Sequence, residues 1–577
     1  MYKEDEEDFS FTSFFVPLTT LKAITIIVIL GFIVFGNALF NSFVWDDKAF
    51  IIFNPEVHSL NIFSLMGQNA FNSLGHYRPI PAVYFASMYA VFKDIPFFYH
   101  FVQIGLHIVN ASLLFILLKK FFDKKLSLFL SLIFLVHPMQ VESVSYIASS
   151  VNTLFLLFGM VALLLLDKEK ISLKRFFIIF GILLLSLLTK ETGFLFLLMA
   201  LLYVFLFKRN ILTSFILGGI TITIIYLLIR LGLAGVAFAK QSFVPIASLP
   251  FDERLLQIPA VLFYYLKTFF FPTDLIVQQH WIISNVTLSQ FYFPLLVLST
   301  LFVLLITFGI HLSKTKIKYL NVFLFFSAWS LIGLMFHSQI FPLDMTVADR
   351  WFYFPIVGLL GLLAVVLTII KFPLAKMKMF VYCVALIILV FFSLRTMTRN
   401  VIWANEISLY THDMRIHNNY QLENDLGAAY MDEKNYEQAL IHAKKSTEMY
   451  SFDTNLFNTG LVYEALGNMQ EAERYYIRAY TSNIFTQGKR NVNIYIRLAK
   501  LYVSKSQYKE ARDVLKKGLQ DYPGVRDMWL LSAITEYQLH NQQEALLAAE
   551  RAKTLSPDEQ TNYLYIKILN NEPIVLE

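Results

Sequence analysis

The sequence is short of charge and nearly without cysteine, and both absences narrow the possible classes of protein. Only 16% of the 577 residues are charged and 56% are hydrophobic, which is too little charge for a soluble protein of this size. The single cysteine, Cys383, lies in an apolar run, so a disulfide or a thiolate metal site within one chain is excluded. A nucleotide-binding glycine loop, a Ser-His-Asp arrangement and Cys/His metal spacing are also missing from the sequence. The net charge of +6 is ordinary for a membrane protein with basic inner loops and does not indicate a nucleic-acid partner.

Long apolar runs dominate the first two thirds of the chain. About 20 apolar residues match the roughly 30 Å hydrocarbon layer of a bilayer, where the backbone satisfies its own hydrogen bonds by forming a helix. We therefore predict an all-α polytopic membrane protein with about eleven transmembrane helices. The predicted spans are 21–40, 98–118, 126–138, 145–166, 176–189, 191–207, 211–231, 291–311, 319–337, 352–370 and 379–396.

Lysine and arginine predict the orientation of these spans. With the N-terminus inside, the very short inner loops hold 16 basic residues and the much longer outer loops hold 8. The apolar segments 79–93 and 257–271 are then predicted to lie in or re-enter the outer interface. If either one alone were counted as a transmembrane span, the basic loops that follow it would fall on the outer side. The predicted domains are an inner tail (1–20), a membrane domain (21–400) whose first outer loop is 41–97, and an outer domain (401–577).

The outer domain repeats with a period near 34 residues. A small residue and an alanine of the following helix are 12 apart four times, as Gly427/Ala439, Gly460/Ala472, Ala499/Ala511 and Ala533/Ala545. This spacing is the tetratricopeptide signature, in which small residues let two antiparallel helices approach and stacked pairs share a core. We predict an α-solenoid of about four repeats over 420–559, a capping helix near 560–571, and one insertion around 481–490. Such arrays present a concave face to a peptide or protein.

Polar groups gather at the outer ends of the predicted helices. A carboxylate beside a bilayer is costly to desolvate and indicates chemistry, ion handling or a partner. Plainer interpretations also fit: a solvated or helix-capping acidic pair, a turn residue with a satisfied imidazole ring, and ion pairs between helix ends. The groups are Asp46 and Asp47, Arg78, His137 and Glu142, Lys190 and Glu191, and Asp349, Arg350 and Tyr353.

The chemistry that these residue types support is transfer from a lipid-phosphate donor. Asp46 or Asp47 is predicted to act as general base toward an acceptor hydroxyl, with no basis for choosing between the two. Arg78, Lys190 and Arg350 are predicted to hold the phosphate and stabilise it as the leaving group. The lipid tail confines the donor to the bilayer, and this proximity supplies much of the remaining rate enhancement.

Two further features of the sequence are a polar pair within one predicted span and the possibility of a metal at the acidic pair. His107 and Asn110 lie on one face of the span at 98–118 and are predicted to form interhelical hydrogen bonds. A divalent metal is conceivable at Asp46 and Asp47, because carboxylates suit hard cations, but two adjacent aspartates are too few ligands to predict a metal site.

Several short motifs occur along the membrane region: Phe43-Val44-Trp45-Asp46-Asp47, Arg78-Pro79, Tyr99-His100 with Leu106-His107 and Asn110, His137-Pro138 with Glu142, Lys190-Glu191-Thr192-Gly193, and Ala348-Asp349-Arg350 with Tyr353 and Pro355. With these motifs the region resembles that of the transmembrane and TPR-repeat-containing O-mannosyltransferases, which are GT-C glycosyltransferases. The resemblance covers essentially the whole chain, including the order of membrane region and then repeats. One stretch differs, because Ser149-Ser150-Val151-Asn152 stands where that family usually has Gly-Arg-x-Asp.

The resemblance implies an eleven-span GT-C fold with the catalytic acidic pair in the first outer loop. It implies a polyprenyl-phosphate sugar as donor substrate and an inverting transfer to a hydroxyl. The sequence itself indicates no cofactor. His137, Glu142, Glu191 and Tyr353 would join the three cations in binding the donor or substrate. The expected partner is a protein or peptide acceptor on the repeats, and the sequence does not give the oligomeric state.

Other functions are compatible with the same features. One is sugar transfer to a lipid or polysaccharide, with the repeats recruiting other proteins, and another is a membrane scaffold without catalysis. The Lys-, Asn- and Ile-rich composition and the single cysteine suggest a bacterial inner membrane with periplasmic repeats. An ER membrane with lumenal repeats is the alternative, because Asn285-Val286-Thr287 would be a glycosylation acceptor there.

Overall fold

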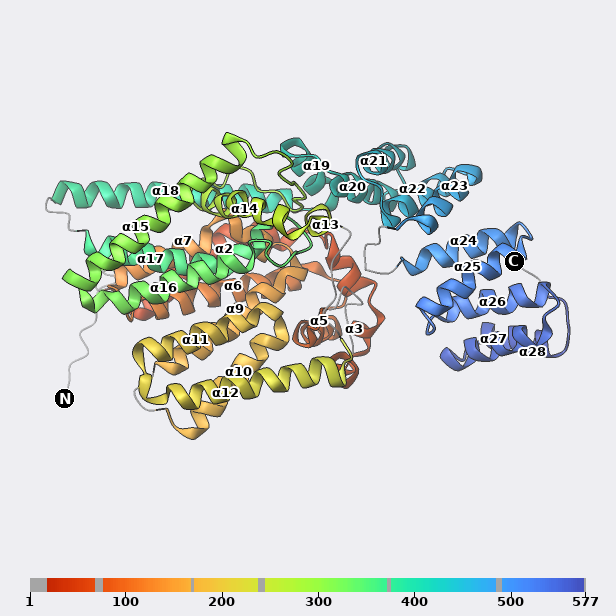
Figure 1. The fold of residues 1–577 in the computed structure, drawn as a ribbon, viewed down its shortest axis with the longest axis horizontal. Helices are drawn as coiled ribbons and strands as arrows, with labels where there is room; N and C mark the ends of the chain where they lie inside the picture. The colour runs from red at the N-terminus through yellow and green to blue at the C-terminus, as the bar shows by residue number, and fades with distance from the viewer. Residues whose placement is uncertain are drawn as a thin grey trace, which may run out of the picture. The chain divides into compact units, whose positions relative to one another are not determined.

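The structure is a computed structural model that describes residues 18–67, 76–167, 171–236, 244–370, 375–483 and 490–574. The chain divides into two compact units, which we call the membrane unit and the repeat unit (Figure 1). The membrane unit comprises Met1–Ala239 and Pro245–His417, and the repeat unit comprises Lys240–Val244 and Asn418–Glu577. Most of the predicted inner tail, residues 1–17, lies outside the described residues.

Helices form nearly all regular structure in the described part of the membrane unit, apart from one β-bridge between Gln279 and Val347. The longer helices are α2 (Thr20–Phe35), α5 (Pro79–Phe92), α6 (Pro96–Leu118), α7 (Lys124–Val136), α9 (Ser150–Leu166), α10 (Leu173–Thr189), α11 (Phe194–Phe207), α12 (Leu212–Leu227), α14 (Phe251–Phe270), α15 (Phe293–Thr315), α16 (Ile317–Phe336), α17 (Pro355–Ile369), α18 (Ala375–Ile402) and α19 (Glu406–Ile416). Short helices join them: η1 (Gly36–Phe40), η2 (Lys48–Ile52), α3 (Pro55–Ser59), α4 (Ile62–Gly67), η3 (Pro138–Gln140), α8 (Val141–Val144), η4 (Ile147–Ser149), η5 (Glu191–Gly193), η6 (Arg209–Ile211), η7 (Leu228–Leu233), α13 (Pro245–Ser248), η8 (Leu288–Tyr292) and η9 (Asp349–Tyr353).

Seven helical segments in the described residues are long and apolar enough to cross a bilayer. They are Thr20–Phe40, Pro96–Leu118, Ile147–Leu166, Arg209–Leu233, Leu288–Thr315, Ile317–Phe336 and Met379–Ile402, and the bent pair Lys124–Val136 and Pro138–Val144 gives an eighth if it is one span. The apolar helices Pro79–Phe92, Glu191–Phe207 and Pro355–Ile369 are shorter. The prediction of an all-α polytopic membrane protein is therefore confirmed, whereas the count of eleven spans is not.

The bend after α7 has a local cause. Asp123 starts the helix by accepting hydrogen bonds from the backbone N–H groups of Lys125 and Leu126, at 3.0 and 3.1 Å. The helix ends at Val136 because the residue before a proline is disfavoured in the α conformation, and His137 is accordingly extended. The chain then turns by 51° into the segment that carries Glu142.

Buried polar side chains join the helices of the bundle. The imidazole of His107 on α6 hydrogen-bonds the Tyr353 hydroxyl at 2.8 Å and the Leu135 carbonyl at 2.9 Å. The Asn110 amide donates to the Thr153 carbonyl at 2.9 Å and to the Tyr353 hydroxyl at 3.2 Å. These contacts confirm the predicted interhelical hydrogen bonds and fix η9 against α6.

The first outer loop folds around its own apolar core. Fully buried side chains from η2, α3, α4, α5 and the start of α6 pack together, namely Ile51, Val57, Leu65, Phe85 and Tyr99. The burial of these apolar side chains offsets the conformational entropy that the loop loses when it becomes ordered. The acidic pair at its start is therefore held by a packed structure.

A buried ion pair ties α18 to α19. Arg399 donates to both carboxylate oxygens of Asp413, at 2.6 and 3.1 Å, and Asp413 also accepts from the backbone N–H of Val277 at 2.7 Å. A buried carboxylate without such partners would be costly. These contacts explain why the compact membrane unit extends to His417, beyond the predicted boundary at 400.

Replacing Asp413 with Ala should destabilise the protein by about 3–5 kcal/mol, because Arg399 would stay buried without its counter-ion. Asp274→Ala is the matched control, because the Lys267–Asp274 pair is about half exposed and should be worth at most about 1 kcal/mol. Thermal unfolding of the detergent-solubilised full chain measures both. Equal melting temperatures for the two variants would contradict the structural role of the buried pair.

The repeat unit consists of successive helix pairs. The pairs are α20 (Tyr420–Asp432) with α21 (Tyr436–Met449), α22 (Asp453–Ala465) with α23 (Met469–Thr481), α24 (Val492–Ser504) with α25 (Tyr508–Asp521), and α26 (Arg526–Gln538) with α27 (Gln542–Leu555), followed by α28 (Glu559–Leu569). A Cβ added to Gly427 would lie 3.3 Å from the Ala439 carbonyl and 3.2 Å from the Ala443 nitrogen. The close approach predicted from the spacing of 12 is therefore present. Most of the predicted insertion, residues 484–489, lies outside the described residues.

Candidate active site

The two aspartates of the first outer loop have different environments. Asp47 is fully buried, and its carboxylate accepts hydrogen bonds from the backbone N–H groups of Ala148 (2.6 Å) and Val44 (3.2 Å). Burial raises the pKa of Asp47 well above its ordinary value, against the effect of these backbone donors. With both oxygens engaged by the backbone, Asp47 ties the first loop to η4 and is poorly placed to meet a substrate.

Asp46 is only partly buried, and one of its oxygens accepts a hydrogen bond from the Tyr146 hydroxyl at 2.7 Å. Burial raises the pKa of Asp46, while the Tyr146 hydrogen bond and the nearby Arg350 charge oppose the rise. Trp45 stacks on Tyr146 with ring centroids 5.0 Å apart, and its left-handed backbone (φ 55°) turns the chain sharply before the acidic pair. Glu406 holds this turn by accepting from the Trp45 N–H at 3.1 Å.

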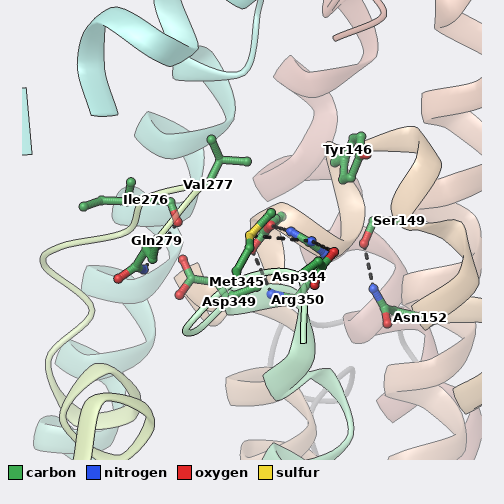
Figure 2. Close-up of polar contacts among 12 residues, drawn as sticks. Tyr146, Ser149, Asn152, Ile276, Val277, Gln279, Asp344, Met345, Asp349 and Arg350 are labelled. Atoms are coloured by element: carbon green, nitrogen blue, oxygen red, sulfur yellow. Dashed lines mark hydrogen bonds and ion pairs between the residues drawn. The ribbon is translucent and has the colours of Figure 1, made fainter. Parts of the chain in front are cut away.

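Arg350 reaches the same region from η9. Its guanidinium donates to the Glu142 carboxylate, and its backbone N–H donates to the other oxygen of Glu142 at 2.9 Å. The guanidinium also lies 5.2 Å from the centre of the Trp45 ring and 3.9 Å from the Asp344 carboxylate. Figure 2 shows Arg350 beside Asp344 and Met345. Arg350 thus joins η9 to Trp45 in the first outer loop and to Glu142 in α8.

Glu142→Gln should lower stability by about 3 kcal/mol, because Arg350 would remain mostly buried without a full counter-charge. Adding Arg350→Met to Glu142→Gln should restore most of that stability by removing the unpaired cation. Thermal unfolding of the full chain measures both variants. A double variant no more stable than Glu142→Gln would show that the pair does not act as a unit.

Lys190, between α10 and η5, is a buried cation with a neutral partner. Its ammonium group donates to the side-chain oxygen of Asn152 at 2.6 Å, and the Asn152 amide donates to Ser149 at 2.8 Å (Figure 2). In the part of the chain that the structure describes, Lys190 has no ion pair. Burial, together with the positive charges of Arg78 and Arg350, lowers the pKa of Lys190 to about 7. Lys190 is therefore within electrostatic range of both arginines and of the Glu191 and Asp344 carboxylates, while its direct partner in the described structure is the neutral Asn152.

Arg78 belongs to a second group of charges, around Glu191. The Glu191 carboxylate lies 3.1 Å from the Arg78 guanidinium, 3.4 Å from that of Arg230 and 3.5 Å from the His76 imidazole. Arg230 is itself 1% exposed and also donates to the Tyr226 hydroxyl at 2.9 Å. The Glu191 carboxylate thus pairs with two arginines and holds Arg78 beside the residue that follows Lys190.

His137 and Tyr353 differ in their contacts from the other predicted site residues. Both ring nitrogens of His137 are engaged by backbone, with Nε2 at 2.9 Å from the Phe269 carbonyl and Nδ1 accepting from the Met139 N–H at 3.3 Å. The Tyr353 hydroxyl is occupied by His107 and Asn110, as described above. These contacts favour structural roles, and for His137 they match the turn residue with a satisfied ring.

Three residues of the site were not predicted from the sequence: Tyr146, Arg230 and Asp344. Asn152 was noted only as part of the stretch that differs from the O-mannosyltransferases. Arg230 had a usable signal, because it is a charge at the end of an apolar run, where ionisable residues are usually functional or paired. Tyr146 and Asp344 had no comparable signal. Among the described residues, no group of three or more His, Cys, Asp or Glu side chains is arranged to hold a metal ion.

Comparisons with known proteins add an independent observation. A family model described as "Tetratricopeptide repeat" matches residues 452–524. The human Protein O-mannosyl-transferase TMTC3 is 26% identical over 569 residues, which cover 88% of this chain and 61% of that protein. The Caenorhabditis elegans Protein O-mannosyl-transferase F38B6.6 is 26% identical over 449 residues, covering 73% of this chain and 62% of that protein.

The similarity to the mouse protein is of the same size, with 25% identity over 575 residues. The chain spans about three fifths of the length of these relatives. The resemblance predicted from the motifs is confirmed: over most of its length, this membrane protein with tetratricopeptide repeats is similar to proteins named protein O-mannosyl-transferases.

Proposed function

We propose that the chain is an integral-membrane glycosyltransferase that moves a sugar from a polyprenyl-phosphate donor to a hydroxyl group of a protein. The observation that carries the proposal is a continuous chain of contacts between a partly exposed carboxylate, Asp46, and a buried cation, Lys190. Asp46 accepts from the Tyr146 hydroxyl at 2.7 Å, and the Tyr146 carbonyl accepts from the Ser149 N–H at 3.1 Å. Ser149 accepts from the Asn152 amide at 2.8 Å, and Asn152 accepts from the Lys190 ammonium group at 2.6 Å. The similarity to proteins named O-mannosyl-transferases supports a sugar as the transferred group and mannose as the first sugar to test.

Asp46 is the proposed general base. Its carboxylate takes the proton of the acceptor hydroxyl as the hydroxyl oxygen attacks the anomeric carbon of the sugar. The bond from the anomeric carbon to the phosphate oxygen breaks, and the electron pair leaves with the polyprenyl phosphate. The Tyr146 hydroxyl holds one oxygen of Asp46 at 2.7 Å and leaves the other for the substrate. Asp47 is a positioning residue, because its contacts fix the loop rather than face the reaction.

Lys190 is the proposed main contact of the donor phosphate. A buried cation without a carboxylate partner gains most from an arriving anion, and the poorly hydrated surroundings strengthen that interaction. Arg78 and Arg350 add positive charge while their carboxylate partners, Glu191 and Glu142, hold them in place. The leaving phosphate would thus be stabilised as charge builds on its oxygen.

The orientation and partners follow from the same proposal. The positive-inside pattern of the loops supports a site on the exoplasmic face of the membrane. The repeats would bind the acceptor protein or a partner that delivers it, which is the usual task of tetratricopeptide arrays.

The test is sugar transfer by the purified full chain in nanodiscs, with labelled polyprenyl-phosphate mannose as donor and a Ser/Thr-rich peptide as acceptor. Labelled peptide, dependent on both substrates, is the expected result. Label found only in lipid or polysaccharide when membranes of the source cell are supplied would replace the protein acceptor with a lipid one. Absence of transfer to any acceptor, with a folded protein, would contradict the proposal.

A further inference from the structure

A pocket of about 360 Å³ lies in the membrane unit beside the end of α14, outside the residues used above. Its buried floor is formed by Thr268, Ile276 and Gln279, with Tyr264 between floor and rim. The exposed rim includes Phe271, Ile416 and His417 and the ion pair of Lys267 with Asp274, 3.0 Å apart. The pocket therefore combines hydroxyl and amide groups with an apolar wall, and it opens at the surface of the membrane unit.

The polar floor is rigid because its groups bond to one another. The Tyr264 hydroxyl donates to Asp349 at 2.6 Å and accepts from the Gln279 amide at 2.6 Å. The Gln279 oxygen accepts from the indole of Trp281 at 3.1 Å, and the Thr268 hydroxyl donates to the Tyr264 carbonyl at 2.7 Å. A fixed floor of this kind suits recognition of a defined ligand, because little order is lost on binding.

The floor connects to the proposed catalytic centre through two consecutive residues. Asp349 lies on the side of Gln279 and Ile276, whereas Arg350 lies beside Asp344 and Met345 (Figure 2). Segment η9 thus lies between the pocket and the charged groups proposed to hold the donor. A polypeptide held in the pocket would have to continue past η9 for one of its hydroxyl groups to reach those groups.

The size and position of the pocket favour a polypeptide. Ligand pockets usually measure about 300–1,000 Å³, so 360 Å³ suits a few residues of a peptide and is too small for a long polyprenyl chain. The apolar wall of Phe271, Ile276 and Ile416 suits amino-acid side chains better than a free sugar. The pocket also lies beside η9, because its residue Tyr264 donates to Asp349 at 2.6 Å.

We propose that this pocket binds a short segment of the acceptor polypeptide, so that neighbouring residues of the same polypeptide pass η9 and bring a hydroxyl side chain to the catalytic centre. The inference rests on the proposed function and adds to it the place where the acceptor is held. Binding there would lower KM for the acceptor and leave the donor's KM unaffected.

The binding test uses a fluorescent reporter on the full chain in nanodiscs. Phe271→Cys in a Cys383→Ser background is labelled with an environment-sensitive dye and titrated with a peptide of alternating Thr and Val. Phe251→Cys is the matched control, because Phe251 is exposed at the other end of the same helix, about 30 Å away. The expected result is a saturable change at position 271 only, with an at least tenfold weaker response when Ile416→Trp narrows the rim.

Several outcomes would overturn the inference. They are the lack of a saturable response, an equal response at position 251, and a response to polyprenyl phosphate or free mannose in place of the peptide. In the transfer assay, Ile416→Trp should raise KM for the peptide at least tenfold and leave KM for the donor unchanged.

The two proposals fail in different ways. Saturable peptide binding by a chain that transfers no sugar would contradict the proposed function and leave the pocket assignment standing. Sugar transfer by Ile416→Trp with an unchanged KM for the peptide would overturn the pocket assignment and leave the proposed function standing.

Discussion

Replacing Asp46 with Asn should lower the turnover number by about a thousandfold and leave the protein folded. The amide keeps the oxygen that accepts from Tyr146, so the loop should be retained, but it cannot take a proton at neutral pH. The turnover number is measured with saturating donor and peptide, and thermal unfolding of the same sample shows whether the protein is folded.

Asp47→Asn is the comparison that separates base from positioning residue. Its carboxylate accepts two backbone hydrogen bonds, and an amide accepts only on its oxygen, so this variant should lose stability and only part of its activity. Wild-type turnover in Asp46→Asn, or a larger loss of turnover in a folded Asp47→Asn, would contradict the assignment of Asp46 as the base.

Lys190→Met should weaken donor binding by about a hundredfold, because a charge-assisted hydrogen bond to the phosphate is lost. In the wild type, donor affinity should also depend on pH. The pKa of Lys190 is lowered to about 7, so the cation is present below that pH and is lost as the pH rises through it. The donor is a phosphodiester whose charge is constant over this range. Its affinity should therefore fall with rising pH, by up to about tenfold for each pH unit above 7. Equilibrium binding of labelled donor between pH 6 and 9 measures the slope.

Two substitutions control this prediction. Lys190→Arg keeps its charge throughout the range and should remove the pH dependence. Asn152→Asp would give Lys190 a carboxylate partner at the position of the present 2.6 Å contact, which should raise its pKa and move the loss of affinity to higher pH. Identical pH profiles for the wild type and Lys190→Arg would show that another group governs donor binding.

Features set by local pattern could be predicted from the sequence. Apolar runs indicated the helices because their length matches a bilayer, and the constant spacing of Gly427 from Ala439 indicated paired helices because only small residues allow that approach. The packing of the two helices in a repeat depends on this local spacing and not on the rest of the fold, so the sequence alone indicates it. The number of spans was less predictable, because α11 and α17 are apolar but shorter than a full crossing.

Features set by tertiary partners could not be predicted. Asp46 and Asp47 are chemically equal neighbours, and only their contacts with Tyr146 and Ala148, about 100 residues away, distinguish them. Arg350 pairs with Glu142, 208 residues away, and also lies 3.9 Å from the Asp344 carboxylate. No pattern in the sequence states which helix ends will meet.

The central claim is that Lys190, Arg78 and Arg350 surround the donor phosphate next to Asp46. A cryo-EM map of the full chain in nanodiscs with bound polyprenyl-phosphate mannose tests it most directly. The account predicts phosphate density within hydrogen-bonding distance of the Lys190 ammonium group, with the anomeric carbon facing Asp46. Phosphate density elsewhere, with Lys190 still bound only to Asn152, would contradict it.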